Sequence, residues 1–313
     1  MSDYPTDISL YLAEPRGFCA GVRRAIAIVE DALSRFGAPV YVRHEIVHNK
    51  HVINELKHKG AVFVEDFTDI PQGSIVIFSA HGVSRQVAAE ATDKGFVCID
   101  ATCPLVEKVH QQISKYAAQN MEIIVIGKPS HPEIIGTLGQ LPKDYPSVHV
   151  ISSAAEAQEL TIAPHKDIGF VTQTTLSVDD TKAIVDILHQ RFPSIHGLQK
   201  KDICYATTNR QQAIKALAAQ CECVLVLGSK NSSNSRQLRD VALKNGANQA
   251  FLIDDASEID WPALNGLPRI GISAGASAPE YLVEDLIESF RRRYNKINIQ
   301  YVMVAKENVN FKL

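Results

Sequence analysis

The chain has 313 residues, 45% hydrophobic and 21% charged, which is typical of a globular protein with room for about two or three compact units. Its net charge of −3, with 32 Lys and Arg against 35 Asp and Glu, argues against a general nucleic-acid-binding protein. No apolar stretch approaches the roughly 18 residues of a membrane span, and the first residues lack a signal pattern, so we expect a cytoplasmic protein that does not contact membranes.

The first predicted elements are a short apolar strand at residues 8–13 and, after Cys19, an amphipathic helical stretch. A β-branched run at residues 39–43 predicts a second strand, and the polar loop after it contains His48. A further strand at residues 74–80 leads to a second polar loop, which contains His81. Strands that alternate with helical stretches are typical of α/β units with parallel strands.

The same order recurs twice along the chain. Cys103 precedes a helical stretch, a strand at residues 122–127 and a polar loop with His131, and a later strand at residues 167–173 precedes a second loop. Cys204 likewise precedes a helical stretch, a strand at residues 223–228 and a polar loop, and a strand at residues 269–274 leads to the last loop. The spacing from the cysteine to its first loop is 29 residues to His48, 28 to His131 and 28 to Ser232.

This repeat predicts three weakly similar α/β units with mostly parallel sheets, at residues 1–97, 98–196 and 197–285, in a pseudo-threefold arrangement. The remaining residues, 286–313, contain a strand-like run at 297–305 and have no counterpart in the repeats, so we expect them to pack back on another unit. Ligand sites of parallel sheets form at the carboxyl ends of the strands, so the polar loops could all face one central cavity.

The six cysteines do not suggest a disulfide framework, because cytosolic thiols stay reduced. Buried cysteine usually acts as a small core hydrophobe, and this reading suits Cys98, Cys221 and Cys223, which lie in or beside apolar runs. Cys19, Cys103 and Cys204 differ because each precedes a helix at the equivalent place in a repeat, where the helix dipole favours a thiolate.

Three converging thiolates could hold zinc or an iron–sulfur cluster, and they would leave one coordination position open for chemistry. The polar loops could surround an anion such as a diphosphate, although Ser and Asn in loops often serve only as caps. The candidate anion-binding residues are His48, His81, His131, Ser232, Ser233, Asn234 and Ser277.

Glu133 is the best-placed acid for moving protons, although a loop carboxylate is more often a solvated charge. Thr174 and Thr175 could orient a substrate hydroxyl, or could merely cap the following helix. No phosphate-binding P-loop motif is present, so a diphosphate would be part of the substrate rather than a nucleotide to be split.

Eight ordered motifs resemble the 4-hydroxy-3-methylbut-2-enyl diphosphate reductase family, the last enzymes of the methylerythritol phosphate route to isoprenoids. They are RGFCAGVRRAI, the region from VRHEIVHN to FSAHGVS, DATCPLVEKVH, SHPEIIGTLGQ, TQTTLSVDDT, DICYATTNRQ, GSKNSSNSRQL and SAGASAPE. The resemblance runs nearly end to end. It implies three similar α/β units around a central 4Fe-4S cluster, and an iron–sulfur oxidoreductase.

The resemblance also assigns roles to residues. It implies that Cys19, Cys103 and Cys204 hold one cluster with an open iron, and that Glu133 relays the proton. It implies that Thr174 holds the substrate hydroxyl or that relay. The diphosphate would bind to His48, His81, His131, Ser232, Ser233, Asn234 and Ser277. The sequence departs from the family at Lys128, Pro129 and Ser130, where a glycine is expected directly before His131.

The family reaction removes the allylic hydroxyl of (E)-4-hydroxy-3-methylbut-2-enyl diphosphate with two electrons and two protons, and yields isopentenyl and dimethylallyl diphosphate. No G-x-G-x-x-G dinucleotide fingerprint is apparent, so we expect a ferredoxin or flavodoxin as electron donor. Three alternatives stay open: a non-redox hydro-lyase, a sensor that binds a diphosphate without converting it, and a structural zinc protein.

Overall fold

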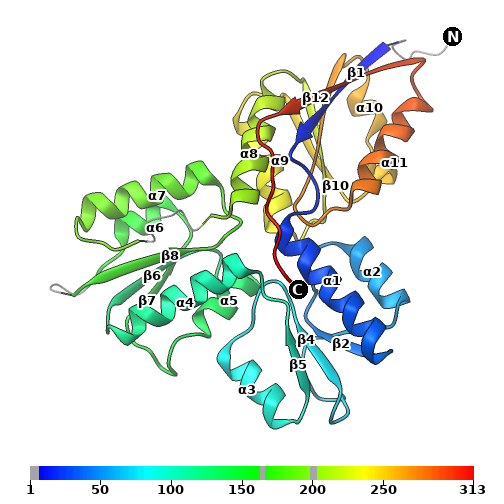
Figure 1. Cartoon of the computed structure of the whole chain (residues 1–313). Coiled ribbons are helices and arrows are strands. Elements are labelled where there is room, and N and C mark those ends of the chain that lie inside the picture. The colour runs from blue at the N-terminus through cyan, green and yellow to red at the C-terminus, as the bar shows by residue number, and fades with distance from the viewer. Residues whose placement is uncertain (1–6, 163–165, 198–202) are drawn as a thin grey trace. The chain divides into compact units, whose positions relative to one another are not determined.

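The computed structural model describes residues 7–162, 166–197 and 203–313, which form an α/β protein with three parallel sheets (Figure 1). The chain divides into two compact units. Unit 1 comprises residues 1–20, 48–52 and 205–310, and unit 2 comprises residues 21–47, 53–204 and 311–313. The predicted fold class is confirmed, whereas the boundaries at residues 97, 196 and 285 and the pseudo-threefold arrangement stay predictions.

Unit 1 contains a five-stranded parallel sheet with the strand order β10-β9-β11-β1-β12. Its strands are β1 (Asp7–Glu14), β9 (Cys223–Leu227), β10 (Gln249–Ile253), β11 (Arg269–Ala274) and β12 (Lys296–Met303). The predicted strand in the C-terminal segment is therefore present. It pairs in parallel with β1 along the whole of both strands, and β1 pairs on its other side with β11.

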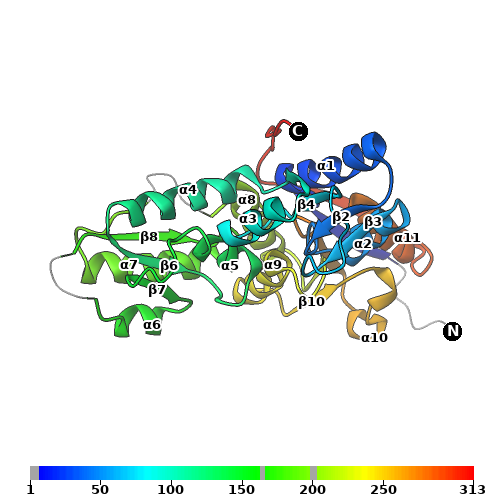
Figure 2. The same cartoon turned by 90° about the horizontal axis from the view of Figure 1, so that it is seen from below.

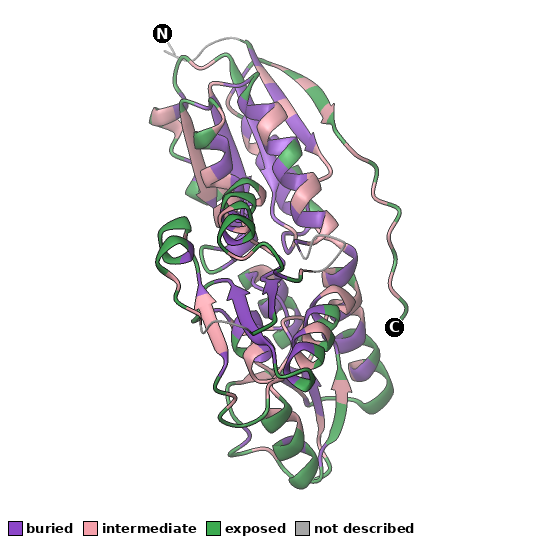
Figure 3. Cartoon of the chain, turned by 90° about the vertical axis from the view of Figure 1, so that its left-hand side faces the viewer, coloured by how far each residue is buried: buried purple, intermediate pink, exposed green. Residues whose placement is uncertain are grey.

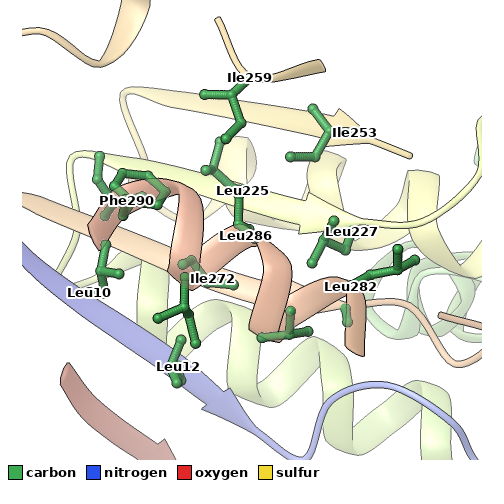
Figure 4. Close-up of a cluster of buried hydrophobic side chains, with 14 of the residues drawn as sticks. Leu10, Leu12, Leu225, Leu227, Ile253, Ile259, Ile272, Leu282, Leu286 and Phe290 are labelled. Carbon is green, nitrogen blue, oxygen red and sulfur yellow. The ribbon is translucent and has the colours of Figure 1, made fainter. Parts of the chain in front are cut away.

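Helices cover both faces of this sheet: α8 (Tyr205–Ala218), α9 (Ser233–Lys244), α10 (Trp261–Leu264) and α11 (Glu280–Arg291), with the short 3₁₀ helix η1 (Ala256–Glu258). Leu10 and Leu225 pack with α11 on one face (Figure 4), and Val224 and Val226 pack with α8 and α9 on the other. Every residue of β9 is buried, which explains its unbroken apolar sequence.

Unit 2 contains two smaller parallel sheets. The first has the order β3-β2-β4-β5, and the second has the order β7-β6-β8. The strands are β2 (Val40–Arg43), β3 (Ala61–Val64), β4 (Ile75–Phe78), β5 (Val97–Asp100), β6 (Glu122–Ile126), β7 (Val148–Ile151) and β8 (Ile168–Thr172). The buried cores of these sheets contain Phe78 and Val76 in the first, and Ile123 and Ile124 in the second. Figure 3 shows in purple which parts of the chain are buried.

Helices α4 and α5 cover one face of β6 and its neighbours, and α6 and α7 cover the other (Figure 2). The helices of this part of the chain are α1 (Ala20–Phe36), α2 (Lys50–His58), α3 (Arg85–Asp93), α4 (Pro104–Ala118), α5 (Pro132–Leu138), α6 (Ala154–Glu159) and α7 (Val178–Arg191). The first residues of α1 and α2 belong to unit 1. No helix in the described residues combines the length and apolar character needed to cross a membrane.

The cysteines outside the predicted site differ in burial. Cys221 and Cys223 are buried, as expected, and burial raises the pKa of each thiol to about 12. The prediction that Cys98 is a core hydrophobe is wrong, because its side chain is exposed. Cys98 lies on β5, an edge strand of its sheet. The apolar sequence of this segment gives no sign that its side chains are exposed.

Candidate functional site

The three predicted cysteine ligands share one position relative to a helix. Cys19 directly precedes α1, Cys103 is the N-cap of α4, and Cys204 directly precedes α8. All three are partly exposed, and none of the chain's six cysteines is in a disulfide. The Cys103 side chain makes no capping hydrogen bond to its helix. The thiols thus face the positive end of a helix dipole, which favours thiolates that can bind a metal.

Each of these cysteines is also held by its backbone to the second polar loop of another repeat. The Cys103 N–H donates to the carbonyl of Ala80 at 3.0 Å, beside His81. The Cys204 N–H donates to the carbonyl of Thr174 at 3.2 Å, and the Cys19 N–H donates to that of Ala276 at 3.1 Å, beside Ser277. The same backbone bond therefore recurs at all three cysteines.

Glu133 is the most unusual carboxylate of unit 2. It lies in the first turn of α5 and is only 3% exposed. Its two carboxylate oxygens accept hydrogen bonds from Thr174, one from the backbone N–H at 2.6 Å and one from the hydroxyl at 3.0 Å. Burial raises the pKa of Glu133 to about 7, although both bonds from Thr174 act in the opposite direction. The carboxyl can therefore hold or release a proton near neutral pH.

His131 is the N-cap of α5, and its Nδ1 accepts the backbone N–H of Glu133 at 3.2 Å. The Lys128 N–H donates to Gln173, and the His131 N–H donates to the Lys128 carbonyl at 2.9 Å, so the loop closes as a turn with serine at position 130. The departure from the family pattern before His131 therefore leaves the helix cap intact.

His81 lies beside His131 in the same unit, with their ring centroids 6.0 Å apart. Gly82, the next residue, has a positive φ of 79°, and a Cβ there would lie 2.5 Å from the His110 ring. Only glycine fits this turn, which fixes the direction of the His81 side chain. His44, which was not predicted, also lies beside His81, with the ring centroids 5.9 Å apart, and its Nδ1 contacts Glu65.

The predicted anion-binding residues of unit 1 gather at the start of α9 and in the loop after β11. Ser232 is the N-cap of α9, and its hydroxyl oxygen accepts bonds from the backbone and side chain of Ser235. Ser277 donates to the carbonyl of His48 at 2.9 Å. Ser233 and Asn234 form the first turn and are buried. Capping explains Ser232, but it does not account for Asn234.

Asn234 is 4% exposed, and neither its amide nitrogen nor its amide oxygen has a hydrogen-bond partner among the described residues. A buried amide without partners is costly, so such a group points to a ligand that completes its bonds. Gln173, which was not predicted as a site residue, is buried as well. Its side-chain amide accepts a hydrogen bond from the Lys128 N–H and donates one to the Thr175 hydroxyl, so it joins the two loops around Glu133. Its position directly before the TTLS segment is the feature of the sequence that could have identified it as a site residue.

The predicted site residues are thus joined in two groups. In unit 2 a chain of contacts connects Cys103, His81, His131, Glu133, Thr174 and Cys204. In unit 1 the other group comprises Cys19, His48, Ser232, Ser233, Asn234 and Ser277. Fold and site define a class: parallel α/β proteins with cysteine thiols at helix N-termini and a buried acid whose pKa lies near neutrality.

The comparisons with known proteins identify the family within this class. The model of the LytB protein family matches residues 10–291, and the chain belongs to this family. A relative from Ruegeria pomeroyi named 4-hydroxy-3-methylbut-2-enyl diphosphate reductase is 53% identical over 306 residues, covering 98% of this chain and 96% of the relative. One from Gluconobacter oxydans with the same name is 50% identical, covering 98% and 91%.

Solved structures agree with this assignment. The E-1-hydroxy-2-methyl-but-2-enyl-4-diphosphate reductase from Plasmodium falciparum is 40% identical, with a TM-score of 0.93, and the match covers 99% of this chain and 96% of that one. A second structure, described as (E)-4-hydroxy-3-methyl-but-2-enyl diphosphate reductase, is 30% identical with a TM-score of 0.65, and the match covers 91% and 99%.

Proposed function

We propose that the protein reduces (E)-4-hydroxy-3-methylbut-2-enyl diphosphate to isopentenyl and dimethylallyl diphosphate, with two electrons and two protons. The observation that carries this proposal is Glu133, a carboxyl whose pKa burial raises to about 7 and whose two oxygens accept hydrogen bonds from the backbone N–H and the hydroxyl of Thr174. Loss of an allylic hydroxyl needs a proton donor, because hydroxide is a poor leaving group and water is a good one.

Cys19, Cys103 and Cys204 would hold one 4Fe-4S cluster. Their donor set suits it, because all three are partly exposed thiols at the same position before a helix, and none is in a disulfide. Three thiolates leave one iron without a protein ligand. When bound, the cluster would supply single electrons and a Lewis-acidic iron for the substrate oxygen.

The diphosphate would be bound by His48, His81, His131, Ser232, Ser233, Asn234 and Ser277. Asn234 supports this role most directly, because its buried amide lacks a partner among the residues described. Histidine rings and a helix N-terminus supply hydrogen-bond donors to phosphate oxygens without making the whole chain basic. Electrostatic attraction would therefore be local to the site.

Thr174 would orient the reacting groups. Its backbone N–H and hydroxyl hold both oxygens of Glu133, so the carboxyl has one fixed orientation. When Glu133 is protonated, its O–H can donate a hydrogen bond to the Thr174 hydroxyl. The Thr174 hydroxyl can in turn donate a hydrogen bond to the substrate hydroxyl. Glu133 would then give its proton, through Thr174, to the substrate oxygen as the C–O bond breaks, so that the oxygen leaves as water. The two electrons from the external donor would remain on the allyl group, a second proton would add to one of its carbons, and solvent would reprotonate Glu133.

We propose a ferredoxin or flavodoxin as the electron donor and a cytoplasmic location. The chain has no dinucleotide fingerprint, so single electrons would reach it from a separate redox protein. Neither nucleic acid nor a membrane has a part in this function.

An anaerobic assay tests the proposed function. The protein is reconstituted with iron and sulfide, and reduced viologen serves as electron donor for the hydroxylated allylic diphosphate. Viologen oxidation coupled to formation of both C5 diphosphates is the expected result. Turnover without any donor would favour the hydro-lyase, tight diphosphate binding without product would favour the sensor, and colourless protein with stoichiometric zinc would favour a structural metal site.

A further inference from the structure

Arg210 of unit 1 is a fully buried cation, with an exposed fraction of 0%. It lies in α8, and its guanidinium donates five hydrogen bonds. Two reach the carbonyl of Gly17, at 3.1 Å from Nε and 2.7 Å from Nη2. One reaches the carbonyl of Ala206 at 3.0 Å, and two reach the Glu307 carboxylate at 3.0 and 3.4 Å. A guanidinium has five N–H groups, so this arrangement uses all of them.

Gly17 is part of the loop that carries Cys19. Its φ of 66° lies in the left-handed region, and its N–H donates to the Ala274 carbonyl at 3.1 Å. The bonds from Arg210 hold the other side of the same peptide segment, two residues before the thiol. Arg210 therefore fixes the approach of the chain to Cys19.

Glu307 completes the arrangement from the segment that follows β12. Its side chain is 10% exposed, and it accepts a further hydrogen bond from Asn209 at 3.1 Å. Removal of the counter-charge of a buried cation strongly destabilises the folded arrangement around that cation. The position of Arg210, and with it the carbonyl of Gly17, thus depends on a carboxylate about 290 residues further along the chain.

We propose that Glu307 is a positioning residue for the Cys19 loop and acts through Arg210. The C-terminal segment then belongs to the machinery that presents this thiol, although it lies outside the family motifs found in the sequence. The inference rests on the proposed role of Cys19 as a cluster ligand. Its structural part, the dependence of the loop on Glu307, can be tested without a cluster.

The test is the alkylation rate of each thiol in the full-length chain after removal of iron, measured with iodoacetamide and mass spectrometry. In Glu307→Ala we expect Cys19 to react about tenfold faster, a factor equivalent to the loss of one hydrogen bond to a charged group. Cys103, in unit 2, serves as an internal reference and should keep its rate. Glu307→Gln keeps the size and one acceptor, so we expect a smaller increase, and it replaces the alanine variant if that variant does not fold.

Glu222→Gln is the matched control. It removes the charge from the ion pair of Glu222 with Arg269, another ion pair of unit 1, at the opposite end of β9 from the Cys19 loop. An unchanged Cys19 rate in both Glu307 variants would overturn the proposal, as would an equal increase at Cys103 or in Glu222→Gln.

A second measurement links the loop to the metal. Iron release from the reconstituted protein to a ferrous chelator should be faster in Glu307→Ala than in the wild type and in Glu222→Gln, and the reduced protein should show a shifted electron paramagnetic resonance spectrum. Release and spectrum identical to the wild type would contradict the proposed link to the cluster. Failure of the wild type to take up iron and sulfide would contradict the proposed function alone, because the alkylation rates report on Glu307 independently.

Discussion

Two buried carboxylates of unit 2 show how the environment of a residue sets its chemistry. Glu122 at the start of β6 is 5% exposed, but Lys166 and His149 contact it. Burial alone would raise its pKa; the hydrogen bonds from these partners outweigh that effect and lower it. For Glu133 only the two uncharged donors of Thr174 oppose the effect of burial, so burial dominates and the pKa of this carboxyl rises to about 7. Glu122 is thus suited to stability and Glu133 to proton transfer.

The first prediction concerns Glu133→Gln. Glutamine keeps the size and the bond to the Thr174 N–H but cannot donate a proton as an acid does, so we expect a loss of turnover of about 10²- to 10⁴-fold. Iron and sulfide content and substrate affinity should be retained. Glu122→Gln, another buried carboxylate in the same unit, should keep its turnover. Full activity of Glu133→Gln would exclude the proton-relay role.

The second prediction concerns the pH dependence of stability in the cluster-free chain. Below pH 4.5, the ordinary pKa of Glu, the carboxyl of Glu133 is protonated in both folded and unfolded chains. Between pH 4.5 and about 7 only the unfolded chain loses the proton, so folding stability falls, and the full cost persists at higher pH.

Glu133→Gln should therefore be more stable than the wild type at pH 8, by up to about 3 kcal/mol, with the difference shrinking toward pH 5. Urea unfolding at a series of pH values measures it. A difference that stays constant with pH would mean that Glu133 does not titrate in this range.

At the scale of single elements, α9 shows how small residues position the N-terminal turn of a helix for binding. Ser235 is fully buried, and a Cβ at Gly228 or Gly275 would lie 2.2 or 2.1 Å from its hydroxyl oxygen. The two glycines therefore leave room for Ser235, which bonds the Ser232 cap. This packing holds the first turn of α9 and presents Asn234 in a fixed place.

The third prediction is that Asn234→Ala weakens binding of inorganic pyrophosphate about tenfold, since it removes amide donors that have no partner within the described part of the chain. Calorimetry measures the affinity, and in the assay KM should rise more than kcat falls. Asn245→Ala, at the far end of the same helix, removes a bond to the Val241 carbonyl and should leave pyrophosphate affinity unchanged. Equal affinities of Asn234→Ala and wild type would contradict the anion-binding role.

The fourth prediction concerns the thiol of Cys103, the residue that precedes α4. Cys103→Ala removes the thiol while the backbone bond to Ala80 and the Pro104 start of α4 remain possible. We expect little change in folding of the cluster-free chain and a loss of most bound iron after reconstitution, because two thiolates hold a cluster poorly. Iron and sulfide analysis measures this. Cys98→Ala, on the exposed edge strand, is the control and should bind iron normally.

At the scale of the whole molecule, the recurring backbone bond is the most informative feature. Each of the three cysteines donates its N–H to the loop that ends the preceding repeat, and for Cys19 the preceding repeat is the last one in the chain. The three bonds therefore connect the second repeat to the first, the third to the second, and the first to the third. These bonds tie each thiol to the strand ends of a parallel sheet, while the threefold repeat stays a prediction from motif spacing.

The fifth prediction concerns the core that carries this framework in unit 1. Leu225 in β9 is 1% exposed and packs among Leu10, Ile272 and Leu286 (Figure 4). Leu225→Ala leaves a cavity, and we expect a loss of about 2 to 5 kcal/mol in the free energy of unfolding. Chemical denaturation measures it. Leu243→Ala, an exposed leucine of α9, should change stability by less than about 0.5 kcal/mol.

The sequence by itself determined the local elements. The strands at the eight predicted apolar runs and the helix after each of Cys19, Cys103 and Cys204 are present, because periodicity and helix-start signals act within short segments. Family motifs carried the candidate residues for the same reason: each motif is a local loop. The nearness of Glu133 to Thr174 was expected only from the family resemblance, which implies that Thr174 holds the substrate hydroxyl or the proton relay.

Only the tertiary structure decided how distant segments meet. It placed β1 between β11 and β12, exposed Cys98 on an edge strand, buried Glu133 beside Thr174, and brought Glu307 to Arg210. None of these follows from local pattern, because strand order, burial and counter-charge depend on neighbours supplied by the rest of the chain. Residue type and spacing thus specify which groups are available, whereas packing decides their protonation, exposure and partners.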